Sequence, residues 1–362
     1  MVKQPEINFL SGSEACAQGA IALGCKFFAA SPASHGGGIA NYMAGHLPDA
    51  GGVFLDMEND TAAIAGCIGA SWAGLKVMAN VCASGLSDGA DAISFAIRTE
   101  TPLVIVDIPS AQSGLQQARW GVRGDYQLIV LAPSSAQEMY ELTVEAFNFS
   151  EALRVPVVVL ADSEIARTKE NVSTKKAIKI INRSKRKDAP VFGAARTDTV
   201  APMPPLGSGQ NLSISGFVHD EYGMPKVANA AATAKLFERL QNKILSNAKE
   251  IIKAESQIPE DSKIILVSYG ICARASSAAM KLARKEGYKV GTLRLKTLWP
   301  FADEIIKKFC DGKKVIVPEM SKGQLSRELQ RCLRADVVPL LKTDGEAITP
   351  LEILEKIRKV SQ

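Results

Sequence analysis

Two acidic residues, Glu58 and Asp60, follow the apolar run 53–57 and precede a stretch rich in alanine and glycine that begins at Thr61. The run predicts a buried strand, and Asn59 or Asp60 is a good N-cap for the helix expected next. Open α/β sheets bind ligands at the carboxyl ends of their strands, where a carboxyl group can act as a general acid or base. The alternative interpretation is that Asp60 only caps the helix.

Two glycine-rich loops, at 36–38 and 83–89, follow predicted strands and are of the kind that can cradle a phosphate. Neither has the GxGxxG spacing of a dinucleotide site or a Walker A lysine, which disfavours a nicotinamide or P-loop nucleotide. His35 lies beside the first loop, where ligand contact and simple loop chemistry are both open. The three histidines are far apart in sequence and suggest no metal site.

These candidates need a sheet to position them, and the first half of the chain alternates predicted strands with predicted helices. The strands are expected at 26–30, 53–57, 76–82, 102–108, 128–131 and 156–160. The helices are expected at 11–24, 39–47, from 61, 90–99 and 134–153. A polar loop is expected at 109–126. This alternation predicts an α/β fold with a parallel sheet and right-handed crossovers.

The pattern stops after residue 168, where a basic and polar tract, 169–187, is followed by a segment rich in proline, glycine and serine. We interpret this as a connector that crosses a surface and ends in a long helix over 227–255. A second α/β block starts near residue 258 and alternates again to the end. The expected domains are therefore 1–168, a connector at 169–257, and 258–362.

The composition excludes several classes of protein. The 362 residues are 46% hydrophobic and 22% charged, as in ordinary globular proteins, and no apolar run reaches the length of a membrane span. No secretory signal pattern is visible, so a cytoplasmic location is expected. The net charge of +5 is modest and partly concentrated in 169–187, which gives no reason to expect nucleic acid as a partner. The seven cysteines form no CxxC pair.

Several segments, in order and spacing, resemble the alpha subunit of 2-oxoacid:ferredoxin oxidoreductases. They are VFLDMENDTAAIAGCIGASWAG, GDYQLIVLAPSSAQEMYELTVEAF, VHDEYG in the connector, and TLWPF, VIVPEMSKGQLSREL and ITPLEIL in the second block. The resemblance covers nearly the whole chain and is greatest for the 2-oxoglutarate and branched-chain enzymes. It implies that the first block is the pyrimidine domain of a thiamine diphosphate site and that the second resembles the C-terminal domain of transketolases.

The resemblance also implies a division of labour between subunits. A beta subunit supplies the Mg²⁺ and diphosphate site and a 4Fe-4S cluster, so this chain holds no metal, and gamma and delta subunits are further possible partners. The family reaction decarboxylates a 2-oxoacid, reduces ferredoxin and transfers the acyl group to coenzyme A. We expect 2-oxoglutarate as the substrate, with the branched-chain 3-methyl-2-oxobutanoate as the alternative.

The family's catalytic glutamate corresponds to Asp60, and Glu58 is the second candidate. A carboxyl group hydrogen-bonded to the aminopyrimidine ring helps the cofactor to lose its C2 proton, and burial can keep that carboxyl protonated. The shorter Asp60 has about 1.5 Å less reach than glutamate. The family's Ser-Gly-Pro-Gly loop begins here with Ser84 and Gly85, which are expected to contact the cofactor together with Asp60.

The substrate-binding loops depart from the family pattern. Ser34 keeps a hydroxyl where the family has a threonine that is expected to bind substrate, and His35 replaces a proline. The later Pro-Ser-Thr-Gly run is reduced to the stretch 112–114, so Arg119 or Arg123 is a candidate to pair with the substrate carboxylate. Each arginine taken singly is somewhat more typical of an exposed loop. Altered substrate choice and weakened chemistry are both compatible with these changes.

Three functional hypotheses follow. The first is a catalytic alpha subunit that is active only with its beta partner. The second is a non-catalytic paralogue that acts in complex assembly, suggested by Asp60, Ser34 and the shortened loop. The third is an unrelated nicotinamide dehydrogenase, which the missing dinucleotide fingerprint disfavours.

Overall fold

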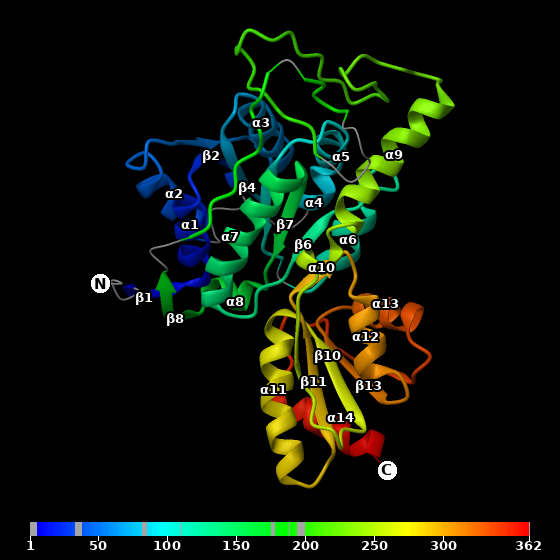
Figure 1. Ribbon diagram of the computed structural model, residues 1–362. Helices are drawn as coiled ribbons and strands as arrows, with labels where there is room; N and C mark the ends of the chain where they lie inside the picture. Colours follow the sequence, from blue (N-terminus) through cyan, green and yellow to red (C-terminus); the bar gives the residue numbers. More distant parts are fainter. Residues whose placement is uncertain are drawn as a thin grey trace, which may run out of the picture.

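Two α/β blocks make up the computed structural model, which describes residues 6–32, 38–81, 85–109, 111–174, 178–187, 189–193 and 200–361. In Figure 1 the first block occupies the upper part of the view and the second lies below it. The connector runs over the top of the first block and returns through helix α9 (Ala230–Leu245). Among the described helices, none is both long and apolar enough to cross a lipid bilayer.

The first block is built on a sheet with the strand order β12-β6-β7-β5-β4-β2-β3. Its strands are β2 (Cys25–Ala30), β3 (Val53–Asp56), β4 (Lys76–Val81), β5 (Leu103–Asp107), β6 (Ile129–Leu131), β7 (Pro156–Leu160) and β12 (Thr297–Trp299). All pairs are parallel except that of β12 with β6, which is antiparallel. Since β12 belongs to the second block, the two blocks share this sheet.

Helices cover both faces of the first sheet. They are α1 (Gly12–Ala22), α2 (Ile39–His46), α3 (Asp60–Trp72), α4 (Gly85–Asp88), α5 (Ala90–Arg98), α6 (Gly114–Trp120), α7 (Ala136–Leu153) and α8 (Ser163–Arg167). Leu103 and Ile105 of β5 belong to the core under α3 and α5, whereas Val104 and Val106 belong to the core under α1 and α7. Two covered faces explain why β5 is almost entirely apolar.

The second block has a smaller sheet with the order β14-β13-β10-β11-β9. Its strands are β9 (Ala254–Gln257), β10 (Ile264–Ser268), β11 (Val290–Leu295), β13 (Lys314–Glu319) and β14 (Val337–Leu341). Its helices are α11 (Gly270–Lys285), α12 (Asp303–Cys310), α13 (Gln324–Cys332) and α14 (Pro350–Ser361). Helix α11 contacts α14 and α12 contacts α13, so the helices form two layers around the sheet. The predicted α/β fold class is confirmed; each sheet is parallel apart from one antiparallel strand, β12 in the first and β9 in the second.

The structure corrects four local predictions. The segment expected as a polar loop at 109–126 contains α6, and the helix expected over 227–255 ends at Leu245 and is followed by α10 (Ala248–Ile251) and β9. An antiparallel ribbon of β1 (Glu6–Ser11) and β8 (Lys169–Thr174) was not predicted. The strand expected to be buried, β3, is instead an edge strand, and its Val53 and Leu55 side chains are exposed.

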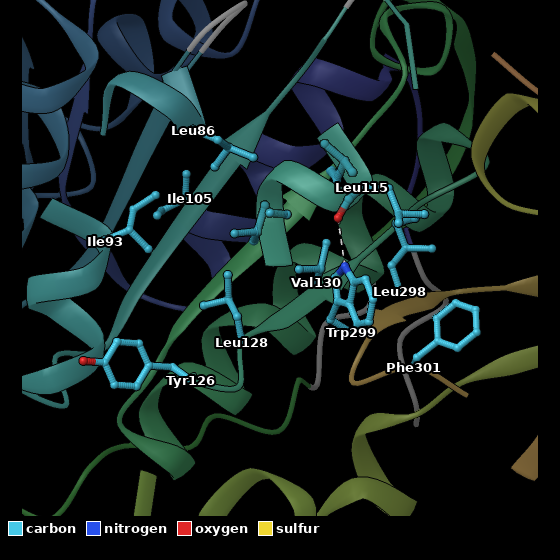
Figure 2. Packing of buried hydrophobic residues seen from close by; sticks show 14 of the residues in the cluster. Leu86, Ile93, Ile105, Leu115, Tyr126, Leu128, Val130, Leu298, Trp299 and Phe301 are labelled. Atoms are coloured by element: carbon cyan, nitrogen blue, oxygen red, sulfur yellow. Dashed lines mark hydrogen bonds between the residues drawn. The ribbon is translucent and has the colours of Figure 1, made fainter. Parts of the chain in front are cut away.

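Apolar side chains from both blocks meet in one core. Figure 2 shows Leu298, Trp299 and Phe301 of the second block packed beside Leu115 and Val130 of the first. The indole Nε1 of Trp299 also donates a hydrogen bond to the Leu115 carbonyl at 2.9 Å. The core under α3, α5 and α6 is therefore continuous between the blocks, and burial of these large side chains contributes to holding them together.

A buried ionic network attaches the connector helix to the first block. Glu100 is fully buried and pairs with Arg239 and with Lys243, the latter at 2.8 Å, and both partners lie on α9. Arg154 donates a hydrogen bond from Nε to the Glu100 carbonyl at 3.0 Å. Burial by itself raises the pKa of Glu100, but the charges of Lys243, Arg239 and Arg154 outweigh it and bring the pKa to about 2.

We expect Glu100→Gln to lower the free energy of unfolding of the chain by about 3–5 kcal/mol, because three buried cations lose their counter-charge. Since the folded pKa of Glu100 lies below its ordinary value, this stabilisation is present above about pH 4.5 and is lost as the pH falls towards 2. Urea unfolding at pH 7 and pH 3 measures both effects. The control is Glu304→Gln in the exposed pair with Lys307, which should change little. Equal effects of the two substitutions would contradict the prediction.

Candidate functional site

The register of three neighbouring strands gathers polar residues at one edge of the first sheet. Val81 at the end of β4 pairs with Asp107 at the end of β5, and Ala30 at the end of β2 is followed by Ser31. Side chains alternate along a strand and paired residues point to the same face, so Asp107 points to the face that α3 covers. Asp60 begins α3 on that face. The carboxyl edge therefore carries two acids on one side of the sheet.

Asp60 is buried at this edge, and the Ser31 hydroxyl donates a hydrogen bond to its Oδ1 at 2.5 Å. The N-cap of α3 is Asn59, whose Oδ1 accepts a hydrogen bond from the Ala62 N–H at 2.8 Å. The interpretation of Asp60 as the cap alone is therefore wrong. Glu58 is exposed in this structure. Of the two acids singled out in the sequence, only Asp60 lies inside the fold, at the carboxyl edge.

Gly85 lies against Asp60, at a position where a larger residue would not fit. A Cβ at position 85 would be 2.7 Å from Asp60 Oδ2 and 2.5 Å from the Val81 Cβ, closer than van der Waals contact allows. The glycine thus permits the close approach of this loop to the carboxyl group. The three other residues expected in these loops, Ser34, His35 and Ser84, lie outside the described residues.

Asp107 is a further candidate residue at this edge, and the sequence interpretation did not include it. It is buried, and its Oδ1 has no hydrogen-bond partner among the described residues. Burial, and after it the charge of Asp60, raises the pKa of Asp107 to about 7. The signal was available in the sequence, because Asp107 is a single acid at the end of an otherwise apolar strand.

The two candidate substrate arginines lie in different environments. Arg119 is buried in α6 with its guanidinium 4.2 Å from the ring centroid of Trp120 and 6.0 Å from that of Trp299, and burial lowers its pKa. Its Nη1 has no partner in the described part of the chain. Arg123 is exposed and pairs with Asp91 at 3.4 Å. No contact between either arginine and Asp60 is found among the residues that the structure describes.

The second block holds the segment that leads from β5 into α6. The Gln112 side chain accepts a hydrogen bond from the Met320 N–H at 3.2 Å and donates to the Tyr269 carbonyl at 3.2 Å, and its own N–H donates to the Met320 carbonyl at 3.1 Å. Gln324 accepts from the Gln116 N–H and donates to the Ser113 carbonyl, both at 2.8 Å. We name this set of hydrogen bonds the loop clamp.

A second contact joins the blocks beside the loop clamp. The Asp162 carboxylate, which follows β7, accepts the Ile271 N–H in the first turn of α11 at 2.5 Å. A negative charge at a helix N-terminus is stabilising because the first-turn N–H groups have no partner within the helix. A Cβ at Gly270 would collide with this carboxylate, so the glycine permits the close approach. Burial raises the pKa of Asp162 to about 7.

These features suit a flat heteroaromatic ring that carries nitrogen acceptors. A buried acid lies beside a glycine that permits close approach of the backbone, and a second buried acid has an oxygen without a partner among the described residues. Both observations fit the aminopyrimidine of thiamine diphosphate. Within the described ranges no group of three or more histidine, cysteine or acidic side chains could hold a metal ion.

A polar cavity of about 350 Å³ lies elsewhere, at the carboxyl edge of the second sheet, and is lined in part by Arg274 and Arg294. Arg274 pairs with Glu170 at 2.5 Å, and Arg294 pairs with Glu138 at 2.6 Å. Because both guanidinium groups are already paired with carboxylates, this cavity has less to offer an anionic ligand than its arginines suggest. The edge that carries Asp60 remains the better candidate for catalysis.

Two family models match the chain in sequence order. Residues 18–239 match the model described as "Pyruvate flavodoxin/ferredoxin oxidoreductase, thiamine diP-bdg", and residues 262–353 match "Pyruvate:ferredoxin oxidoreductase core domain II". The first model includes Asp60, Gly85, Asp107 and both candidate arginines. The second includes the residues of the loop clamp that lie in the second block.

Curated relatives match almost end to end. The chain is 42% identical to a 2-oxoglutarate synthase subunit KorA of Methanocaldococcus jannaschii, covering 96% of this chain and 98% of the relative. It is 30% identical to a ketoisovalerate oxidoreductase subunit VorB of Methanothermobacter thermautotrophicus, covering 98% of each.

Solved structures show the same fold. The 2-oxoglutarate:ferredoxin oxidoreductase of Magnetococcus marinus, with 2-oxoglutarate, coenzyme A and succinyl-CoA bound, superposes with a TM-score of 0.90 at 26% identity. The match covers 99% of this chain but 66% of that one, so the solved chain extends well beyond this one. A split-gene transketolase superposes with a TM-score of 0.57 at 13% identity over 97% of this chain and 98% of that chain, a likeness of fold alone.

We expect Gln324→Ala to loosen the segment that leads into α6, because it removes two hydrogen bonds to backbone groups. Hydrogen exchange of the Gln116 amide should accelerate by about tenfold, which corresponds to about 1.4 kcal/mol of lost protection. The matched control is Gln137→Ala, which removes two bonds to Ser173 within the first block and should accelerate exchange only there. Unchanged protection at Gln116 in the Gln324 variant would show that the loop clamp does not hold the segment.

Proposed function

The chain belongs to the 2-oxoacid:ferredoxin oxidoreductase family as an alpha subunit, and we propose that it serves an enzyme that converts 2-oxoglutarate to succinyl-CoA and CO₂ while reducing ferredoxin. The proposed substrate rests on the 42% identity, over almost the full length, to a 2-oxoglutarate synthase subunit. The solved enzyme with a TM-score of 0.90 has 2-oxoglutarate, coenzyme A and succinyl-CoA bound, which supports the same reaction.

The family model that matches the first block is described as binding thiamine diphosphate. We propose that this chain binds its aminopyrimidine, while a beta subunit contributes the Mg²⁺ and diphosphate site and a 4Fe-4S cluster. Both curated relatives are named as subunits, which supports an assembly of several chains. Gamma and delta subunits are proposed as further partners, with ferredoxin as the electron acceptor. A cytoplasmic location stays a prediction.

Asp60 is proposed as the acid of this site. When bound, thiamine diphosphate supplies the nucleophilic carbon and the electron sink that allow a 2-oxoacid to lose CO₂. In this role the buried Asp60 carboxyl group would hydrogen-bond to the aminopyrimidine ring. The Ser31 hydroxyl, which donates to Oδ1, fixes the orientation of the carboxyl group. Gly85, together with Ser84, is proposed to contact the cofactor beside Asp60.

The substrate carboxylates need cationic or hydroxyl partners. We propose Arg119 as the first candidate, because its buried Nη1 has no partner among the described residues and a guanidinium can bind a carboxylate through two hydrogen bonds. Arg123, Ser34 and His35 remain further candidates for the same task. The stacking of Arg119 beside Trp120 restricts its motion, so that less side-chain entropy is lost on binding.

The branched-chain reaction is the second candidate function. The chain is 30% identical to a ketoisovalerate oxidoreductase subunit over almost its full length, which supports this reaction. That identity is lower than the 42% to the 2-oxoglutarate synthase subunit. The two substrates differ in the substituent on the oxo carbon: 2-oxoglutarate has a chain that ends in a second carboxylate, whereas the branched-chain acid has a short branch with two methyl groups. A cation in the pocket therefore favours 2-oxoglutarate, and an apolar wall favours the branched-chain acid.

We expect Asp60→Ala to lower 2-oxoglutarate-dependent viologen reduction by the purified complex at least about 100-fold, because the site loses its acid. Asp60→Glu restores a carboxyl group of the length found in the family and should retain much of the activity. Glu58→Ala distinguishes the two acids: loss of activity there, with retention in Asp60→Ala, would transfer the role to Glu58. Full activity of Asp60→Ala in an active complex would contradict the site assignment. A wild-type complex with no activity towards any 2-oxoacid would favour the assembly paralogue.

The substrate is tested by comparing kcat/KM for 2-oxoglutarate and 3-methyl-2-oxobutanoate in the same complex. We expect a preference of at least about 100-fold for 2-oxoglutarate, because a buried cation left without its carboxylate costs roughly 3 kcal/mol. The reverse preference would assign the chain to the branched-chain enzymes.

A further inference from the structure

More positive than negative charge is buried where the connector helix α9 meets the first block. Arg154, Arg239 and Lys243 are all buried, and the carboxylate of Glu100 is the one that all three share. Among the described residues, no other acid forms an ion pair with any of these cations. Buried charges are costly unless they are paired, so this excess of cations favours an anionic ligand nearby.

A cavity of about 310 Å³ lies beside this network, along one side of α9. Ala232, Lys235 and Arg239 line it at spacings of three and four residues, which is the spacing of one helix face. Arg239 binds Glu100 through Nη1, and no bond from its Nε or Nη2 to another described residue is found. A guanidinium group has five N–H donors in a fixed fork, so Arg239 retains donors that suit an oxyanion.

Another part of the lining is a hairpin of the connector, residues 217–226, which we name the connector hairpin. Its shape is fixed by its own hydrogen bonds, since the Asp220 carboxylate accepts the N–H groups of Tyr222 and Met224, both at 3.0 Å. His219 also lines the cavity, and its Nε2 is buried without a partner in the described part of the chain. The lining is therefore preformed and has hydrogen-bonding capacity that the described residues do not use.

The charged side chains around this cavity are not balanced. Two acids, Asp220 and Glu221, line it, and Asp220 already pairs with Lys226 at 3.4 Å. Lys235 is exposed at the cavity, and Arg239 lies deeper and belongs to the network with excess positive charge. In the cavity of the second sheet, by contrast, each guanidinium group has a carboxylate partner. The cavity beside α9 is thus the better candidate for an anion.

We propose that this cavity is a binding site for a small molecule with a phosphate or carboxylate group, which the Arg239 guanidinium binds and Lys235 attracts. A volume of about 310 Å³ suits a small metabolite. The anion adds negative charge beside the buried cations and holds the connector hairpin against α9. Glu100 precedes β5 and Asp107 ends it, so the site lies towards the amino edge of the first sheet and is separate from the edge that carries Asp60.

The test uses the purified complex with thiamine diphosphate in excess, so that cofactor sites do not take up the probe. Sodium phosphate and sodium malonate are titrated separately, with sodium chloride at equal ionic strength as the reference. Hydrogen exchange of the Asp220 and Lys226 amides, which bond within the connector hairpin, reports on the cavity. We expect both amides to exchange more slowly and to reach a plateau. A response to one probe alone identifies whether a phosphate or a carboxylate is bound.

Two variants locate the site. Arg239→Gln should weaken the apparent affinity about 10- to 100-fold, because it removes hydrogen bonds to a charged group. Ala232→Asp puts a carboxylate into the lining at the third residue of α9, where a negative charge favours the helix, and should weaken binding at least about tenfold. The matched control is Ala230→Asp in the same first turn, an exposed position outside the lining, which should change the affinity about twofold.

Arg239→Gln is expected to fold, because Glu100 keeps Lys243 and Arg154. If it does not, Ala232→Asp and its control decide. Slower exchange that chloride reproduces, or that both Arg239→Gln and Ala232→Asp leave unchanged, would overturn the site. Amides of the connector hairpin that are protected in the complex and respond to neither probe would overturn it too, because another chain would then cover the cavity.

Discussion

The parallel register of β2, β4 and β5 is the constraint on which the site depends. Parallel strands in register end at the same edge of the sheet, so residues that follow separate strands are brought together there. Ser31, at the end of β2, orients Asp60, and Asp107, at the end of β5, faces the same side of the sheet. A slip of one residue in β5 would turn Asp107 to the opposite face, under α1 and α7, and the pair of acids would be lost.

The second block contributes to this edge by holding the segment that leads into α6. Its β10 and β13 end where α11 and α13 begin on opposite faces, which is the point at which doubly wound sheets often bind a ligand. Here that point is filled by Gln112 of the first block, through its bonds to Tyr269 and Met320. The block thus works as a support that fixes the path from β5 into α6, and with it the position of Arg119.

The sequence predicted the parallel strands and most helices because both signals are local: apolar runs of strand length, and caps such as Ser11 and Asn59. It did not predict β1, β8, β9 or β12, which pair antiparallel. It could not show that β3 is an edge strand or that β12 crosses to the first sheet, because strand order is set by contacts between distant segments. Asp60 was found through its neighbours and a family resemblance. Asp107 was missed because a single acid in a strand has no spacing pattern, and its meaning depends on which face it occupies.

The most direct measurement is an experimental structure of this chain with its beta partner and thiamine diphosphate, at a resolution that shows the aminopyrimidine ring. We expect an oxygen of Asp60 within hydrogen-bonding distance, about 2.6–3.0 Å, of a ring nitrogen. A ring held by Glu58, by another chain's acid or by no acid at all would contradict it.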